Sequence, residues 1–311
     1  MKEKTLNILV ILLSIFVLFE LLIDKSMIYE SIMDALKMWV KSLIPALFPF
    51  FIISDILINY NITYYIPKII KKICKYVFNI SDNMLSILFL SMLSGFPSSA
   101  RNTRYFYGKG LIDLDEANHI LIFSHFANPV FILSTVAVFF FHNERLGIIL
   151  LISHYLSNIV LGICFRNKFT HDNYKNVDIL FSNKFSDVFM SAIKNAIDTI
   201  LMICGILVVF LTLTTIVINI LNLNIYNAMI VKSIFEITIG LQSLGILNIG
   251  IYYKGIIASM VLAFGGICVH MQVISYIIGS EIKYRYFFMG RIFQMIIAPI
   301  ITYLILIICG F

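Results

Sequence analysis

The sequence predicts an all-α polytopic membrane protein, a helix bundle of two inverted repeats that each contain a re-entrant segment and an interrupted helix. Hydrophobic residues make up 60% of its 311 residues and charged residues only 13%. A soluble domain is about half apolar and about a quarter charged, so a soluble core cannot absorb this excess. Apolar stretches of about 20 residues, long enough to cross roughly 30 Å of hydrocarbon as helices, recur along the chain.

Seven apolar segments are predicted to cross the membrane. The first, Leu6–Ile23, follows a basic start and lacks the small residues of a cleavage site, so we interpret it as an uncleaved anchor. The other spans are Leu43–Tyr60, Ala117–Phe141, Leu146–Phe165, Ile200–Ile220, Gly255–Gly279 and Ile292–Cys309. Two amphipathic segments, Ser31–Ser42 and Asp187–Thr199, are expected to lie at the membrane interface.

Two further segments, Met84–Ala100 and Ala228–Leu247, are short or polar for lipid-facing helices, and the distribution of charge decides how they run. If both cross, ten Lys and Arg lie in the cytoplasm and twelve outside, which contradicts the positive-inside bias. If both are re-entrant, seventeen lie inside and five outside, with Lys232 within the second segment. We therefore expect two re-entrant segments in the inner cell membrane, with a cytoplasmic N-terminus.

The re-entrant interpretation gives two stretches with the same order of elements: interfacial helix, span, re-entrant segment and interrupted span. One begins outside and the other inside, as in the inverted repeats of secondary transporters, whose sites lie between the repeats. Ala35-Leu36-Lys37 is echoed by Ala192-Ile193-Lys194. The expected parts are an N-terminal anchor (1–30), a first repeat (31–141), a connecting helix and cytoplasmic loop (142–186), a second repeat (187–280) and a C-terminal helix (281–311).

Interruptions of the apolar segments are the expected binding elements for a small polar solute. Freed backbone groups at membrane depth must be buried or line a cavity, and the N-terminus of a half-helix offers partial positive charge. Close helix packing by small residues is the alternative. The residues expected at the site, besides Glu236, His125 and His270, are Ser94, Gly95, Pro97, Ser98, Ser99, Asn128, Pro129, Thr238, Gly240, Gly265, Gly266 and Gln272.

Glu236 is the sharpest single candidate, because an acid at membrane depth is costly and usually faces a bundle interior or water. It is expected to bind a proton or the solute, and the alternative is a structural pair with Lys232 one helical turn earlier. Asp55 ranks second. His125 and His270 flank two interruptions and are candidates for hydrogen bonding or proton relay, with a satisfied buried imidazole as the alternative. Arg101 is either a contact for an anion or a plain cytoplasmic anchor.

Several classes of site are not expected. The five cysteines are odd in number and form no CxxC, so we predict no disulfide and no metal site. The net charge of +6 fits cytoplasmic loops better than a nucleic-acid partner. Asp113 and Glu116 have the spacing of a capping box and are expected to start a helix. No catalytic residues and no cofactor are predicted, and the sequence leaves the oligomeric state open.

Four strings, SGFPSSA, FSHFANPVFIL, FEITIGL and AFGGICVHMQV, resemble landmarks of the sporulation integral membrane protein YlbJ family, although SGFPSSA departs from the SGYP-[IM]-GA form of that family. The resemblance implies paired nucleoside-recognition (Gate) regions and a membrane protein needed for spore cortex formation. It implies a transporter-like protein rather than an enzyme, with a solute such as a nucleoside or cortex-related metabolite and a coupling ion as partners besides the bilayer. The alternative is a non-transporting scaffold or regulator of a sporulation assembly.

Overall fold

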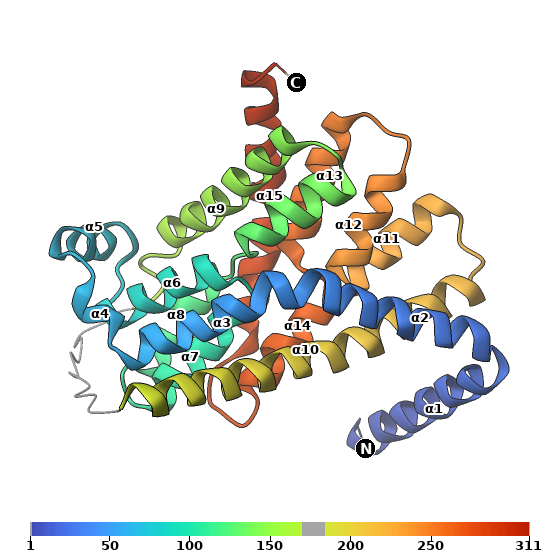
Figure 1. Cartoon of the computed structure of the whole chain (residues 1–311), viewed down its shortest axis with the longest axis horizontal. Helices are drawn as coiled ribbons and strands as arrows, with labels where there is room; N and C mark the ends of the chain where they lie inside the picture. Colours follow the sequence, from blue (N-terminus) through green and yellow to red (C-terminus); the bar gives the residue numbers. More distant parts are fainter. Residues whose placement is uncertain (1, 170–183, 311) are drawn as a thin grey trace.

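The computed structural model describes residues 2–169 and 184–310, and in these ranges the chain is helical without strands (Figure 1). Five helices are long and apolar enough to cross a membrane, and a bent pair, Lys68–Phe78 with Asp82–Ser94 at 94°, makes a sixth if it counts as one span. The five are Lys25–Asn59, Glu144–Cys164, Phe185–Ile220, Ile251–Ile277 and Tyr284–Ile308. The all-α polytopic class is therefore confirmed. Lys175, one of the charges of the predicted cytoplasmic loop, lies outside the described residues.

Two long helical rods run side by side through the molecule (Figure 1). One rod is continuous from α2 (Lys25–Met38) through a π-helical turn, η1 (Trp39–Leu43), to α3 (Ile44–Asn59), and the other is α10 (Phe185–Ile220). The rods are antiparallel, since Ser31 hydrogen-bonds Thr215 at 3.0 Å and the Trp39 indole donates to the Ile200 carbonyl at 2.9 Å. Helix α1 (Lys2–Ile23), at the first predicted span, lies apart from the bundle.

The rods differ from the sequence prediction at their amphipathic ends. Ser31–Ser42 and Asp187–Thr199 are not separate interfacial helices, because each continues into the neighbouring span within one rod. Nothing in α10 terminates the helix at this junction. In the first rod, Pro45 falls in the first turn of α3, where a missing N–H is tolerated, directly after the π-helical turn.

Two helical hairpins occupy the positions of the predicted re-entrant segments. Helices α6 (Asp82–Ser94) and α7 (Ser98–Gly108) pack against each other, and the tip between them is Gly95–Pro97. Helices α11 (Ile225–Phe235) and α12 (Ile237–Ile246) pack likewise, with Glu236 alone at the tip. Gly95 has φ +75°, a left-handed conformation that glycine adopts without strain.

Two helices are interrupted near the predicted positions. Helix α8 (Leu114–Phe123) begins with the predicted capping box of Asp113 and Glu116, and the chain is non-helical from Ser124 to Asn128 before it resumes and forms π-helical η2 (Phe131–Phe140). Ala117–Phe141 is therefore not one continuous span. The proline at 129 explains the break, since proline disfavours helix in the residue before it. Helices α13 (Ile251–Phe264) and α14 (Gly266–Ile277) meet at Gly265, whose φ is +84°.

The elements come in the same order in residues 25–164, here the first half, and 185–308, the second half. Each half has a rod, a hairpin, an interrupted helix and a last long helix, which is α9 (Glu144–Cys164) in the first and α15 (Tyr284–Ile308) in the second. Only the first half carries two additional short helices, α4 (Ile62–Tyr65) and α5 (Lys68–Phe78). Helix α15 packs against α8, α9 and α13, which brings the two halves together.

Candidate functional site

Both hairpin tips and both interruptions meet around one small cavity in the middle of the bundle. Its volume is about 30 Å³, which is enough to hold water. Polar groups come from both halves: Asn128 at the first interruption, Glu236 and Thr238 at the second tip, and Gln272 on α14. The remaining lining is apolar: Leu43, Leu47, Phe96, Phe131, Ile203, Leu207, Ile237 and Val269. We call this space the central cavity.

The first tip is held against the first interruption by Asn128. Its amide donates to the carbonyls of Leu93 and Ser94 at 3.2 and 3.4 Å, at the end of α6, and its side-chain oxygen accepts from the Val130 amide at 2.8 Å. Asn128 thus caps two half-helices at once. The fit is close, since a Cβ at Gly95 would lie 2.5 Å from the Asn128 backbone nitrogen.

The serines of SGFPSSA close the first hairpin rather than face open space. Ser94 donates to Ser98 at 2.7 Å and accepts from Ser54 of α3 at 3.2 Å, and Ser99 hydrogen-bonds Ser124 of the interruption at 2.5 Å. Ser94, Ser98 and Ser99 are all buried. Because these hydroxyls already have partners, we assign them to the hairpin tip, and solute could reach them only if the tip moved.

Glu236 caps the helix that follows it. Its carboxylate accepts from the Thr238 and Ile239 amides at 2.7 and 2.9 Å and from the Thr238 hydroxyl at 3.0 Å. A carboxylate is favoured at a helix N-terminus, where the backbone amides are unpaired and the helix dipole is positive. The considered pair with Lys232 is not formed, since the ion pairs of the described residues include none between the two. Glu236 is 3% exposed and lines the central cavity.

The second interruption lies directly against this tip. A Cβ on Gly266 would lie 3.2 Å from the Glu236 Cα, so glycine permits the approach. Gln272, on α14, also lines the central cavity, and its side-chain amide donates to the Cys268 sulfur at 3.5 Å. Gly240 lies further along α12 and packs against Ser233 of the other arm, where a Cβ would overlap the backbone. Glycine therefore has two uses here: at Gly266 it lets the interruption lie close to the second tip, and at Gly240 it lets the two arms of the hairpin pack closely.

The two candidate histidines, His125 and His270, do not line the central cavity. His270 is a satisfied imidazole: its Nδ1 is 2.6 Å from the Tyr284 hydroxyl and its Nε2 is 3.0 Å from the Phe264 carbonyl. Neither ring nitrogen of His125 has a hydrogen-bond partner among the described residues. The His125 ring stacks on Phe96 of the first tip with centroids 5.0 Å apart, and Phe287 meets it edge-on at 4.7 Å.

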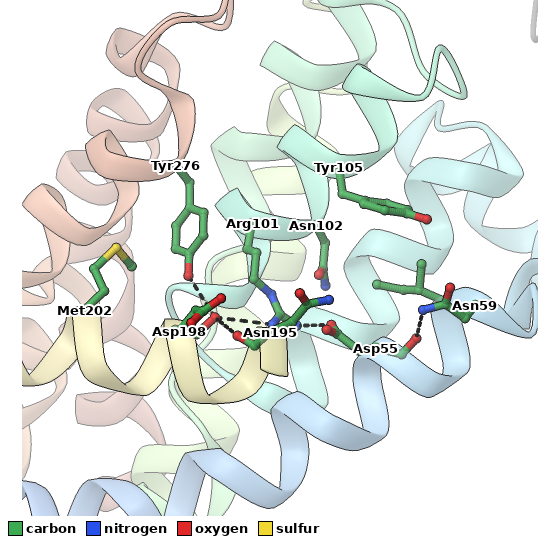
Figure 2. A pocket seen from close by; sticks show the side chains of 11 residues that line it. Asp55, Asn59, Arg101, Asn102, Tyr105, Asn195, Asp198, Met202 and Tyr276 are labelled. Carbon is green, nitrogen blue, oxygen red and sulfur yellow. Dashed lines mark hydrogen bonds and ion pairs between the residues drawn. The ribbon is translucent and has the colours of Figure 1, made fainter. Parts of the chain in front are cut away.

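A larger polar cavity, the first vestibule, opens at one end of the rods (Figure 2). Its volume is about 360 Å³. Arg101 donates to Asp55 at 2.6 Å, and Figure 2 shows the Tyr276 and Tyr105 side chains on either side of Arg101. Asn59, Asn102, Asn195, Asp198 and Thr199 supply further polar groups. Its walls are the end of α3, the start of α10, α7 of the first hairpin and α14 of the second interrupted helix.

A second vestibule of about 400 Å³ lies at the opposite end of the rods. Its walls are α2 and η1, the end of α10, α11 and α12 of the second hairpin, and η2 of the first interrupted helix. Each vestibule thus combines the second hairpin arm of one half with the second part of the interrupted helix of the other. The charged and polar lining consists of Ser31, Asp34, Lys37, Lys41, Ser42, Thr214, Thr215, Lys232, Gln242 and Ser243.

Sequence reasoning missed the vestibules and one buried charge. Asp55 and Arg101 were considered separately because 46 positions separate them, although an acid inside one apolar segment and a base just after another could have suggested a pair. Arg291 was counted among the cytoplasmic charges, and that assignment is wrong. Arg291 is fully buried, because α15 begins at Tyr284, eight residues before the predicted span.

Comparison with known proteins gives one informative match. The sporulation integral membrane protein YlbJ of Bacillus subtilis (strain 168) is 24% identical over 315 residues, which cover 89% of this chain and 77% of that protein. No model of a protein family matches the chain, and no solved structure matches it. This chain is therefore similar, over most of its length, to an integral membrane protein of sporulation, in agreement with the resemblance of the four motifs.

Proposed function

We propose that this protein is an inner-membrane protein required for spore cortex formation and that it moves a small polar solute by alternating access. The observation that carries the proposal is the arrangement of the cavities: two vestibules of several hundred Å³ at opposite ends of the rods and a small central cavity between them. Tips and interruptions bound the central cavity, as in transporters whose sites lie between repeats. The similarity to YlbJ supports the link to sporulation.

The proposal includes inverted repeats within 31–141 and 187–280, with 1–30 as anchor, 142–186 as connection and 281–311 as the last span. Ala35 and Ala192 of the echoed motif are 157 positions apart and both fully buried. The same offset relates residues of the second vestibule to residues of the first: Met38 to Asn195, Lys41 to Asp198 and Ser42 to Thr199. A two-fold relation between the halves accounts for this agreement.

Under the proposal, the first vestibule faces the cytoplasm and the second faces outward, with the N-terminus cytoplasmic. The solute, a nucleoside or cortex-related metabolite, would bind between the tips when they part. Glu236 and Thr238, with Asn128 and Gln272, would contact its polar groups or a coupling ion. The Ser94–Ser99 turn and the Gly265-Gly266 break would be the moving parts, since a cavity of about 30 Å³ has no room for such a solute until they shift.

The decisive experiment is uptake of radiolabelled uridine, as a nucleoside probe, into liposomes containing the purified protein. Glu236→Gln removes the charge of the side chain but keeps an oxygen that can cap α12, so we expect uptake to fall at least about tenfold while thermal stability is maintained. Exposed Glu30→Gln is the matched control. Uptake by the Glu236→Gln protein equal to wild type would count strongly against a role for this carboxylate.

A non-transporting scaffold or regulator is the second candidate, and the mostly apolar lining of the central cavity favours it. The two functions differ in whether water reaches the tips. In a transporter, Thr238→Cys should react with a membrane-impermeant thiol reagent, because the tips part during the cycle. In a scaffold it should stay unreactive, as 1% exposure of Thr238 in this conformation implies.

A further inference from the structure

Arg291 has an unusual environment for a charged side chain. It lies on α15 between α8, α9 and α13 and is fully buried. The residue before it is Gly290, and a Cβ there would overlap the Ile122 carbonyl oxygen of α8. The backbone of α15 at Gly290 therefore lies in direct contact with the backbone of α8 at Ile122, one residue before Arg291.

The guanidinium binds the ends of two half-helices. Its Nη1 donates to the carbonyls of His125 and Ala263 at 3.2 and 3.5 Å, and Nη2 donates to the Ile122 carbonyl at 3.4 Å. Ile122 lies in the last turn of α8, His125 lies in the interruption just beyond that helix, and Ala263 lies at the end of α13. Asn158 of α9 accepts from Nη2 at 3.2 Å, and Gln294 of α15 accepts from Nη1.

No carboxylate neutralises this charge in the described part of the chain, since its three ion pairs are Lys37–Asp34, Lys71–Asp82 and Arg101–Asp55. A buried charge without compensation costs several kcal/mol. The compensation comes from carbonyls at helix C-termini, where backbone acceptors are unpaired and the helix dipole is negative. The same charge thus serves both interrupted helices.

We infer that Arg291 is a positioning residue that ties the C-terminal ends of α8 and α13 together and so fixes the two interruptions relative to each other. Arginine suits this position because its planar guanidinium directs several N–H donors in fixed directions. A lysine ammonium is a compact charge and cannot donate to carbonyls of two helices with the same geometry. The link reaches the first hairpin through His125, whose carbonyl binds Arg291 and whose ring stacks on Phe96. This inference does not depend on what the protein moves.

The test is a distance between α8 and α13 in the folded protein, which a general loss of stability would not change. Spin labels are placed at Asp115→Cys and Tyr253→Cys, exposed positions near the starts of the two helices, after the five native cysteines are replaced. Double electron–electron resonance is recorded on the full chain in lipid nanodiscs. Exposed Arg285→Gln on the same helix is the matched control.

We expect one narrow distance distribution for the wild type and for R285Q, and an about twofold broader distribution for R291Q and R291K, because the two ends are then free to move apart. Wild-type width in folded R291Q would overturn the inference. Wild-type width in R291K alone would show that charge, and not the fork, holds the ends, which would also overturn it. If R291Q does not accumulate as folded protein, R291K is measured in its place.

Discussion

The two vestibules have corresponding walls but opposite charge. The first contains two carboxylates, Asp55 and Asp198, with one guanidinium, whereas the second contains three lysines with one carboxylate. At one pair of positions 157 residues apart the sign is exchanged, since Lys41 stands in the second vestibule where Asp198 stands in the first. The arrangement of helices thus determines the shape of each vestibule, and individual side chains determine the sign of its charge.

The ion pairs of the two vestibules differ as well. Arg101 and Asp55 pair at 2.6 Å with side chains 11% and 9% exposed, whereas Lys37 and Asp34 pair at 3.2 Å with side chains 61% and 68% exposed. Arg101 also donates to Thr199 of α10 at 3.5 Å, so it joins α3, α7 and α10. The Lys37 pair lies within a single helical turn of α2. Among the described residues, a charge pair connects the walls of the first vestibule and none connects the walls of the second.

The largest effect is expected from thiol labelling, which tests whether the two vestibules open to opposite sides of the membrane. With native cysteines replaced, Asp198→Cys should be labelled by an impermeant thiol reagent only in inside-out vesicles, and Lys41→Cys only in intact cells. The two positions are exposed and correspond by the offset, so each is the control of the other. Labelling of both from one side would disprove the inverted arrangement, and labelling of Tyr105→Cys from outside would disprove the re-entrant path of the first hairpin.

A smaller effect concerns the two ion pairs. Asp55→Asn leaves a largely buried guanidinium without its counter-ion, which we expect to lower the free energy of unfolding by about 2–3 kcal/mol, toward the lower end of buried pairs because Arg101 borders the vestibule. Asp34→Asn breaks an exposed pair and should cost only about 0–1 kcal/mol. Thermal unfolding of the two variants in the same detergent gives the comparison. Equal losses would mean that the Asp55–Arg101 pair is not the main connection between the walls of the first vestibule.

The smallest expected effect is electrostatic. Met38→Cys in the second vestibule should react about two- to tenfold faster with an anionic than with a cationic thiol reagent, because Lys41 and Lys232 concentrate anions there. Substitution of both lysines by glutamine should remove the preference. Asn195→Cys in the first vestibule, beside Asp198, should show the opposite preference. A rate ratio near one at both positions would show that the difference in charge does not reach the solution.

Local signals made the first tip and both interruptions predictable. A glycine that must adopt a positive φ, as at 95 and 265, or a proline after Asn128, breaks a helix wherever it lies, so sequence alone located these features. The continuity of the rods was missed because amphipathic character was taken as a boundary, although Ser42 and Thr199 carry no helix-breaking signal. Arg291 was misplaced because charge counting treats a base beside an apolar stretch as part of a loop.

The vestibules could not be predicted because they depend on tertiary contacts. Asp55 meets Arg101 only through the tertiary fold, because α3 packs on α6 and α6 packs on α7, and Thr199 joins them from the second half. Glu236 is a mixed case. Its burial was predicted from the sequence, but its hydrogen bonds come from the helix it begins and not from Lys232. Periodicity and charge counts give no such information about three-dimensional partners.

The central cavity has a consequence for the energy supply of the cell. A membrane that makes ATP must keep its proton gradient, and any continuous water column through a protein would discharge it. Here Phe96, Phe131 and the leucines of the first rod line the space between the two vestibules, and that space is only about 30 Å³. In this conformation the described residues leave the two vestibules as separate cavities, so the bundle offers a proton gradient no open aqueous channel.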